Sequence, residues 1–219
     1  MIFCRDVDLL YWEPDVLSEA AFGSQTLMAG TGNVAGASFT PTTGGAFTSQ
    51  HIEAGQVITF SGAATGCYAI TLIAGPSALS LSAIFDELFP TTGSPPAPVG
   101  ALTANGVNYA IRTFWAQRRV VSDLLMQAVG VVPGTAEAAT ATVLNPEALR
   151  RACVLGTLQM IYSGIAAAAD EPARYAVRAE LYERLYRRAL LAAQVDLDLN
   201  GDGRVDVRRS PGLVRMVRA

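Results

Sequence analysis

The feature that most constrains the fold is the change of pattern on either side of residues 90–100. This segment, PTTGSPPAPVG, holds four prolines and two glycines, a composition typical of an extended, semi-rigid linker. Short alternating or β-branched runs precede it, and apolar residues at helical spacing follow it. The sequence therefore predicts an α+β chain in which a β-module is inserted into a helical domain.

The part before the linker has the pattern of a small β-structure. Residues 20–111 carry only three charged side chains, Glu53, Asp86 and Glu87, and are rich in Gly, Thr, Ser and Ala. Predicted strands cover residues 37–40, 56–60, 67–73 and 78–82. Short strands separated by glycine-containing turns every ten or so residues are typical of a barrel or sandwich. The glycine-rich residues 30–36 are predicted to form a turn between strands, because nothing around them resembles a nucleotide-binding loop.

The part after the linker has the pattern of helices. Predicted helices cover residues 108–129, 145–168 and 170–195, and a short helix is predicted at residues 14–22, before the β-module. Asn145 as N-cap and Pro146 in the first turn mark the start of the second long helix. This helix and the next one predict an αα-hairpin. The small residues Gly156 and Gly164 lie on one face and would allow another helix to approach closely.

A stripe of aromatic side chains, Tyr175, Tyr182 and Tyr186, is predicted to pack in the core.

An uncharged stretch at residues 152–169 is interrupted by Thr157 and other polar residues. It therefore predicts a buried helix rather than a membrane span, and no membrane partner is expected.

These elements give the predicted organisation, which consists of three main helices, a short N-terminal helix, an inserted all-β barrel or sandwich, and an extended C-terminal arm. The predicted segments are the N-terminal part of the helical domain (1–25), the β-module (26–89), the Pro/Gly-rich linker (90–107), the helical domain (108–195), and the acidic loop with an Arg-rich arm (196–219).

Composition and charge exclude two classes of protein. Apolar residues make up 51% and charged residues 16% of the chain, which is the opposite of an intrinsically disordered sequence. A net charge of −3 argues against a generally basic nucleic-acid binder. Residues 1–149 hold 4 Arg and 11 acidic residues, for a net −7, whereas residues 150–219 hold 12 Arg and 8 acidic residues, for a net +4. Such opposite halves favour head-to-tail association of copies.

Cysteine usage and motifs argue against an enzyme. The three cysteines, Cys4, Cys67 and Cys153, are far apart, and His51 is the only histidine. This spacing argues against a disulfide framework and against a Cys/His zinc site. It suits a reducing compartment, or an assembly that does not depend on disulfides. The sequence has no nucleophile elbow, metalloprotease or P-loop motif, so no catalytic activity is expected.

The most specific local motif resembles a calcium-binding loop. The candidate ligands are Asp198, Asn200, Asp202 and Asp206, with the Arg204 carbonyl. Alternating oxygen ligands around a turn glycine are what calcium requires. A register that starts at Asp196 fits as well. Both registers lack the acidic residue at position twelve, where Arg209 or Val207 stands. Calcium would therefore bind weakly and structurally; the alternative is an Asp/Asn/Gly turn that folds the tail back.

The C-terminal residues 204–219 combine arginines with apolar side chains. One interpretation is a frayed, solvated end. The other, which we favour, is an arm that adds to a neighbour's surface and brings arginines to acidic groups or DNA phosphates. The candidate arm residues are Arg208, Arg209, Arg215, Met216 and Arg218.

Three stretches together resemble a known family. They are residues 8–14 with the helix after them, the β-module phrases at residues 47–58 and 68–72, and the Asp-Leu-Asn-Gly-Asp-Gly of residues 198–203 before an Arg-rich tail. With these the chain resembles the head-to-tail connector (adaptor) proteins of tailed bacteriophages.

The resemblance implies a non-enzymatic structural protein that assembles in the host cytoplasm and ends in the neck of the virion. It implies a homo-oligomeric ring of about twelve copies whose terminal arm docks on neighbours. The implied partners are the portal protein, tail or neck proteins, and double-stranded DNA held without sequence specificity. The alternative is a calcium-stabilised binding module whose β-barrel recognises a protein or a glycan.

Overall fold

The computed structural model describes residues 1–20, 25–82, 102–132, 141–168 and 172–212 of the 219-residue chain. The chain divides into two compact units. The barrel unit runs from Arg5 to Phe114, and the helical unit combines Met1–Cys4 with the residues from Trp115 onward. The fold is therefore mixed α+β, as predicted, with five α-helices in the described ranges.

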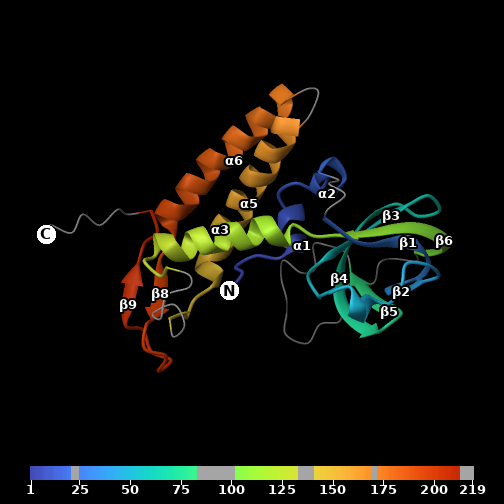
Figure 1. The fold of residues 1–219 in the computed structure, drawn as a ribbon, viewed down its shortest axis with the longest axis horizontal. Helices are drawn as coiled ribbons and strands as arrows, with labels where there is room; N and C mark the ends of the chain where they lie inside the picture. Colours follow the sequence, from blue (N-terminus) through green and yellow to red (C-terminus); the bar gives the residue numbers. More distant parts are fainter. Residues whose placement is uncertain (21–24, 83–101, 133–140, 169–171, 213–219) are drawn as a thin grey trace, which may run out of the picture. The chain divides into compact units, whose positions relative to one another are not determined.

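The barrel unit contains a closed barrel of six antiparallel strands (Figure 1). The strands are β1 (Thr26–Ala35), β2 (Ser38–Pro41), β3 (Val57–Ser61), β4 (Gly66–Gly75), β5 (Ala78–Ser82) and β6 (Thr103–Arg112). Their order around the barrel is β1-β2-β5-β4-β3-β6, and β6 closes it by pairing with both β1 and β3. Closure removes the unpaired edges of a sheet. Of the two predicted forms, the structure therefore has the barrel.

Aromatic rings fill the barrel. Phe39 lies 4.8 Å from Tyr109 and 5.3 Å from Phe60, measured between ring centroids. The 3-10 helix η2 (Phe47–Ser49) adds Phe47 to the same core. Gly32 on β1 stands directly beside the ring of Phe39, where a side chain would collide with it. Residues 30–35 of the stretch predicted as a turn are thus part of β1, because large rings inside a small barrel need a strand with little side-chain volume. Only Gly36 lies in a turn, as predicted.

Strand β6 contradicts two predicted boundaries. Residues 103–107, assigned to the linker, and residues 108–112, assigned to a helix, form this strand, and the helix begins only at Trp115. Val107, Tyr109 and Ile111 are buried while the residues between them are more exposed. This alternation has the period of a strand. The apolar side chains of residues 108–112 also fit the spacing of a helix. Hydrogen bonding with β1 and β3 is what makes this segment a strand.

Two short helices precede the barrel, α1 (Asp6–Leu10) and α2 (Val16–Glu19). The sequence predicted one helix at residues 14–22 and missed α1. Asp6 is buried and accepts hydrogen bonds from Thr113 Oγ1 at 2.7 Å and from the Phe114 amide at 2.9 Å. A buried carboxylate is tolerated when it is hydrogen-bonded in this way. These bonds fix α1 to the end of β6.

The helical unit contains α3 (Trp115–Ala128), α5 (Glu147–Ala168) and α6 (Pro172–Ala192). Helix α5 packs along α6 and also contacts α3 (Figure 1). Half of the residues of α5 are buried, including all of residues 152–158, whereas Ser163, Gly164, Ala167 and Ala168 are exposed. The predicted burial of this uncharged stretch is therefore confirmed for its first half only. None of the described helices has the length and hydropathy that a membrane crossing requires.

Small residues and tyrosines set the spacing of these helices. A Cβ at Gly156 would lie 2.9 Å from Val121 Cγ1 of α3 and 3.1 Å from Tyr186 Cε2 of α6, which confirms the predicted close approach there. At Gly164 a Cβ would meet open space, so that half of the prediction is wrong. Tyr162 of α5 stacks on Tyr182 at 5.8 Å, so Tyr182 belongs to the core as predicted.

Candidate interaction surface

A small sheet closes the end of the helical unit. Its strands are β7 (Thr142–Val143), β8 (Val195–Asp198) and β9 (Val207–Arg209), with β8 in the centre. Asn145, predicted to cap α5, instead accepts a hydrogen bond from the Asp196 amide at 2.8 Å and donates from Nδ2 to the Gln194 carbonyl at 3.0 Å. The side chain of Asn145 therefore ties the start of α5 to the start of β8.

The predicted calcium loop is the turn between β8 and β9. The buried carboxylate of Asp198 accepts hydrogen bonds from the amides of Asn200, Gly201 and Gly203 at 3.1, 2.6 and 2.7 Å. Burial alone would raise the pKa of Asp198, but these backbone hydrogen bonds outweigh it and leave the pKa below its ordinary value. Gly201 and Gly203 have φ of 81° and 80°, in the left-handed region that favours glycine.

The other candidate ligands are engaged in the same way. Asn200 Oδ1 accepts from the Asp202 amide at 2.9 Å, and Asp202 Oδ1 accepts from the Arg204 amide at 2.8 Å. Asp206 accepts from the Leu199 amide at 2.7 Å. Across the described ranges no three Asp, Glu, His or Cys side chains form a group that could hold a metal ion. This geometry favours the alternative of an Asp/Asn/Gly turn.

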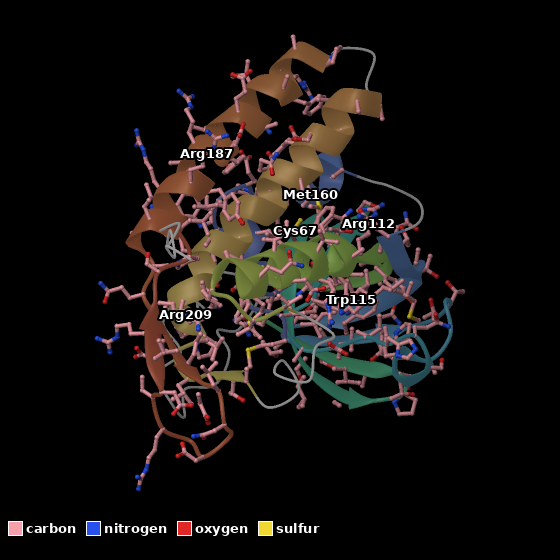
Figure 2. All side chains as sticks on the ribbon, turned by 60° about the vertical axis from the view of Figure 1, so that its left-hand side comes forward. Cys67, Arg112, Trp115, Met160, Arg187 and Arg209 are labelled. Carbon is pink, nitrogen blue, oxygen red and sulfur yellow. The ribbon has the colours of Figure 1, made fainter. Side chains whose placement is uncertain are left out.

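Two residues assigned to the arm are bound within the chain. Arg208 pairs with Asp196 in register across β8 and β9, with Nε 2.5 Å from Oδ1 and Nη2 3.1 Å from Oδ2. Arg209 Nη1 donates to the Val129 carbonyl at 2.6 Å, just after α3. Both arginines thus have partners within the chain, and their predicted contact with a neighbour stays a prediction. Arg209, the last residue of β9, is labelled in Figure 2. Arg215, Met216 and Arg218 lie outside the described residues.

The described chain returns to α6 after β9. A Cβ at Gly212 would lie 2.7 Å from Leu191 Cα and 2.8 Å from Leu191 N. Only a residue without a side chain can pass so close to a helix backbone. The last described residues therefore lie against the end of α6.

Helix α6 carries an unusual exposed face, which we call the α6 outer face. It combines large aliphatic residues and arginines at alternating spacings of four and three, which places them on one side of a helix. Its members are Val177, Leu181, Arg184, Arg188 and Leu191. The aliphatic side chains of this face are well exposed: Val177 by 66%, Leu181 by 42% and Leu191 by 61%. Arg187, labelled in Figure 2, pairs with Glu183 at 2.5 Å along the edge of this face.

A shallow groove of about 350 Å³ lies between α5 and α6. Alanines and Leu185 line most of it, and Arg151 and Arg188 complete the lining. Arg188 thus belongs both to this groove and to the α6 outer face. The surface offers apolar contact and positive charge together, as protein–protein interfaces often do.

The barrel unit has a groove of its own, with a volume of about 470 Å³. Asp15 and Ser18 of the α2 region, Asn108 and Arg112 of β6, and Cys67 of β4 contribute to its lining. Burial raises the pKa of the Cys67 thiol, Asp15 adds to the rise, and Arg112 opposes it. A thiol with a raised pKa is a poor nucleophile, so this groove lacks an activated catalytic group at that position.

Two further candidates from the sequence are the histidine and the neighbouring acidic residues Asp86 and Glu87. His51 is an exposed turn residue with φ of 54°, and Asp86 and Glu87 lie outside the described residues.

Comparison with known proteins gave no match among protein-family models, curated proteins or solved structures.

Proposed function

We propose that this chain is a structural virion protein of a tailed bacteriophage, a head–tail connector that forms a ring of about twelve copies. The ring joins the portal to the tail or neck and surrounds the DNA channel. In this proposal the helices form a compact bundle and the C-terminal residues dock on the portal. The observation that carries the proposal is the α6 outer face.

The composition of that face is what supports association. Val177 and Leu191 each expose more than half of their surface, and burying large aliphatic side chains stabilises a complex. One side of α6 packs on α5, whereas the residues of the α6 outer face are all exposed, so this face is available for contact. Arginine is the cation that interfaces prefer, because its planar group pairs with carboxylates in two places.

The distribution of charge supports a head-to-tail contact in particular. The part of the chain that contains α6 is net positive, whereas residues 1–149 are net negative. Contacts between unlike surfaces of identical copies generate rings when the rotation closes. The acidic part is proposed to line the channel, where repulsion from DNA phosphates lets DNA slide without sequence-specific contacts.

The edge of the small sheet offers a second docking element. Strand β9 pairs with β8 on one side and is at the edge of the sheet. Edge strands accept an added strand from another chain. Arg215, Met216 and Arg218, which follow β9 in the sequence, are proposed to contact the portal.

Measuring the mass of the purified protein by light scattering tests the proposal. The expected species alone, or on portal rings of the same phage, is an assembly of about twelve copies of the 23.0 kDa chain. Leu181→Glu should abolish assembly, because it places a charge in the proposed interface. Leu72→Glu is the matched control, because Leu72 is 57% exposed on the barrel. A protein that stays monomeric in both settings, or a control that disrupts assembly equally, would overturn the proposal.

The alternative function, a binding module, has one observation in its favour. The closed barrel has a groove lined by polar and charged side chains, and mouths and faces of barrels are common ligand sites. The calcium part of that alternative is not supported by the loop geometry. A monomer that captures a protein or glycan through the barrel, and loses it with Arg112→Ala, would favour this function instead.

A further inference from the structure

Two cysteines that are 149 positions apart meet inside the helical unit. Cys4 Sγ lies 2.7 Å from Cys153 Sγ. Cys4 is 3% exposed and Cys153 is 0% exposed. An S–S bond is about 2.0 Å long, so a small movement of either side chain would bring the sulfur atoms to bonding distance.

Hydrogen bonds hold the N-terminal residues in this place. The Phe3 amide donates to Ser122 Oγ of α3 at 3.2 Å, and Arg118 Nη1 donates to the Cys4 carbonyl at 2.9 Å. Ser122 Oγ is also 3.5 Å from Cys153 Sγ. Residues 3–4 are therefore held against α3, and Ser122 of α3 also contacts Cys153 of α5, which lowers the entropic cost of joining the two thiols.

We propose that Cys4 and Cys153 form an intramolecular disulfide when the chain meets an oxidised low-molecular-weight thiol such as glutathione disulfide. The disulfide would join the N-terminal segment covalently to α5. This inference concerns the helical unit alone and does not depend on the proposed function.

The reaction is a pair of thiol–disulfide exchanges. The Cys153 thiolate attacks one sulfur of glutathione disulfide, the S–S bond of the reagent breaks, and one glutathione leaves as its thiolate. The deprotonated Cys4 sulfur then attacks Cys153 Sγ, and the second glutathione leaves. The protein loses two hydrogen atoms as two protons and two electrons, and the reagent is reduced to two glutathione molecules.

The surroundings of the two cysteines shift the pKa values of their thiols in opposite directions. The hydrogen bond from Cys4 is the main cause that lowers the pKa of Cys153, with Ser122 adding to it. The pKa of Cys4 is raised, chiefly by the hydrogen bond that it shares with Cys153 and also because Cys4 is buried. We therefore assign the first attack to Cys153, whose sulfur also lies 3.5 Å from Ser122 Oγ; the disulfide is the same product if Cys4 attacks first. Both are shielded in the folded state, so the first exchange requires residues 1–4 to open, as chain ends do most readily.

The test counts thiols in the folded protein after equilibration with oxidised glutathione and then with reduced glutathione. The Cys67→Ser variant is the main sample, because it leaves only the proposed pair. Oxidation should remove both alkylatable thiols and lower the intact mass by about 2 Da, with no glutathione adduct retained. Peptide mapping should recover Cys4 linked to Cys153 within a monomeric chain. The oxidised form should melt roughly 5 to 10 °C higher than the reduced form.

Single replacements provide the matched comparison. Cys4→Ser and Cys153→Ser, each in the Cys67→Ser background, should retain one thiol or one glutathione adduct and show no thermal shift. Three results would overturn the proposal: two free thiols in folded, oxidised Cys67→Ser protein, a stable adduct in place of the internal bond, or a bond formed between chains. The mass and mapping data need only this one variant, so poor folding of a single replacement does not affect the conclusion.

Discussion

Arg209 Nη1 donates a 2.6 Å hydrogen bond to the backbone carbonyl of Val129, one residue beyond the end of α3. The carbonyls at a helix C-terminus lack intrahelical donors and carry partial negative charge. The arginine thus supplies both a donor and a charge where α3 needs them. Gly130, with φ of 80°, leaves room for the guanidinium, because a Cβ there would collide with Arg209 Nη1.

Replacing Arg209 should therefore destabilise the helical unit. We expect Arg209→Ala to lower the free energy of unfolding by about 1 to 2 kcal/mol, since both the hydrogen bond and the helix-terminus interaction are lost. Urea denaturation followed by circular dichroism measures this change. Arg204→Ala is the control, because Arg204 is exposed in the β8–β9 turn. Equal midpoints for the two variants would show that Arg209 does not support α3.

The two glycines of α5 should respond in opposite directions to alanine. Gly156→Ala should cost about 1 to 3 kcal/mol, because the new methyl group overpacks against Val121 and Tyr186. Gly164→Ala should stabilise by up to about 1 kcal/mol, because the space there is open and alanine is the better helix former. Thermal melts of both variants check the difference, and a stabilising Gly156→Ala would contradict the close approach of the helices.

Calcium should leave the stability unchanged. The carboxylates of the β8–β9 turn already accept backbone amide hydrogen bonds, and Arg209 occupies the position of the acidic residue that completes a calcium loop. We therefore expect no heat of binding and no thermal shift when millimolar calcium replaces EDTA. Asp198→Ala should lower the melting temperature by several degrees in either buffer, because three amides lose their acceptor. A calcium-dependent rise in the wild type would restore the calcium hypothesis.

Acid should weaken the small sheet. The hydrogen bond from Arg208 is the main cause that holds the pKa of Asp196 below its ordinary value, and the pKa of Asp198 is lowered as well. A carboxyl with a depressed pKa in the folded state adds stability above its unfolded pKa of about 3.9, and this stability is lost as the pH falls through the folded value. Stability should therefore decline below about pH 4.

Denaturation midpoints between pH 2 and 7 measure the decline, and Asp196→Asn should make it shallower. An identical pH dependence in wild type and variant would show that the Asp196–Arg208 pair does not contribute.

The local parts of the fold were predictable from the sequence. Helices α5 and α6 begin and end close to the positions that their apolar period and proline signals indicate, and β2 to β5 fall on the predicted alternating runs. These features depend on side chains that are only a few residues apart, so the spacing of apolar residues in the sequence is enough to predict them. The same reasoning predicted that Tyr182 is buried and that Gly156 allows close packing.

The tertiary structure decided what depends on distant residues. Residues 103–112 suit a linker and a helix when taken alone, and become a strand because β1 and β3 offer hydrogen-bonding partners on both sides. From the sequence, Arg209 is predicted to belong to a docking arm. In the folded chain its side chain donates a hydrogen bond to the Val129 carbonyl, just after α3.

Cys4 and Cys153 likewise show no motif in the sequence, and packing of the N-terminal residues against α3 and α5 places them together. Sequence patterns determine which residues are buried and with what period. Which of several compatible partners a residue meets is determined by the packing of the whole core, because only there are hydrogen bonds and volume satisfied together.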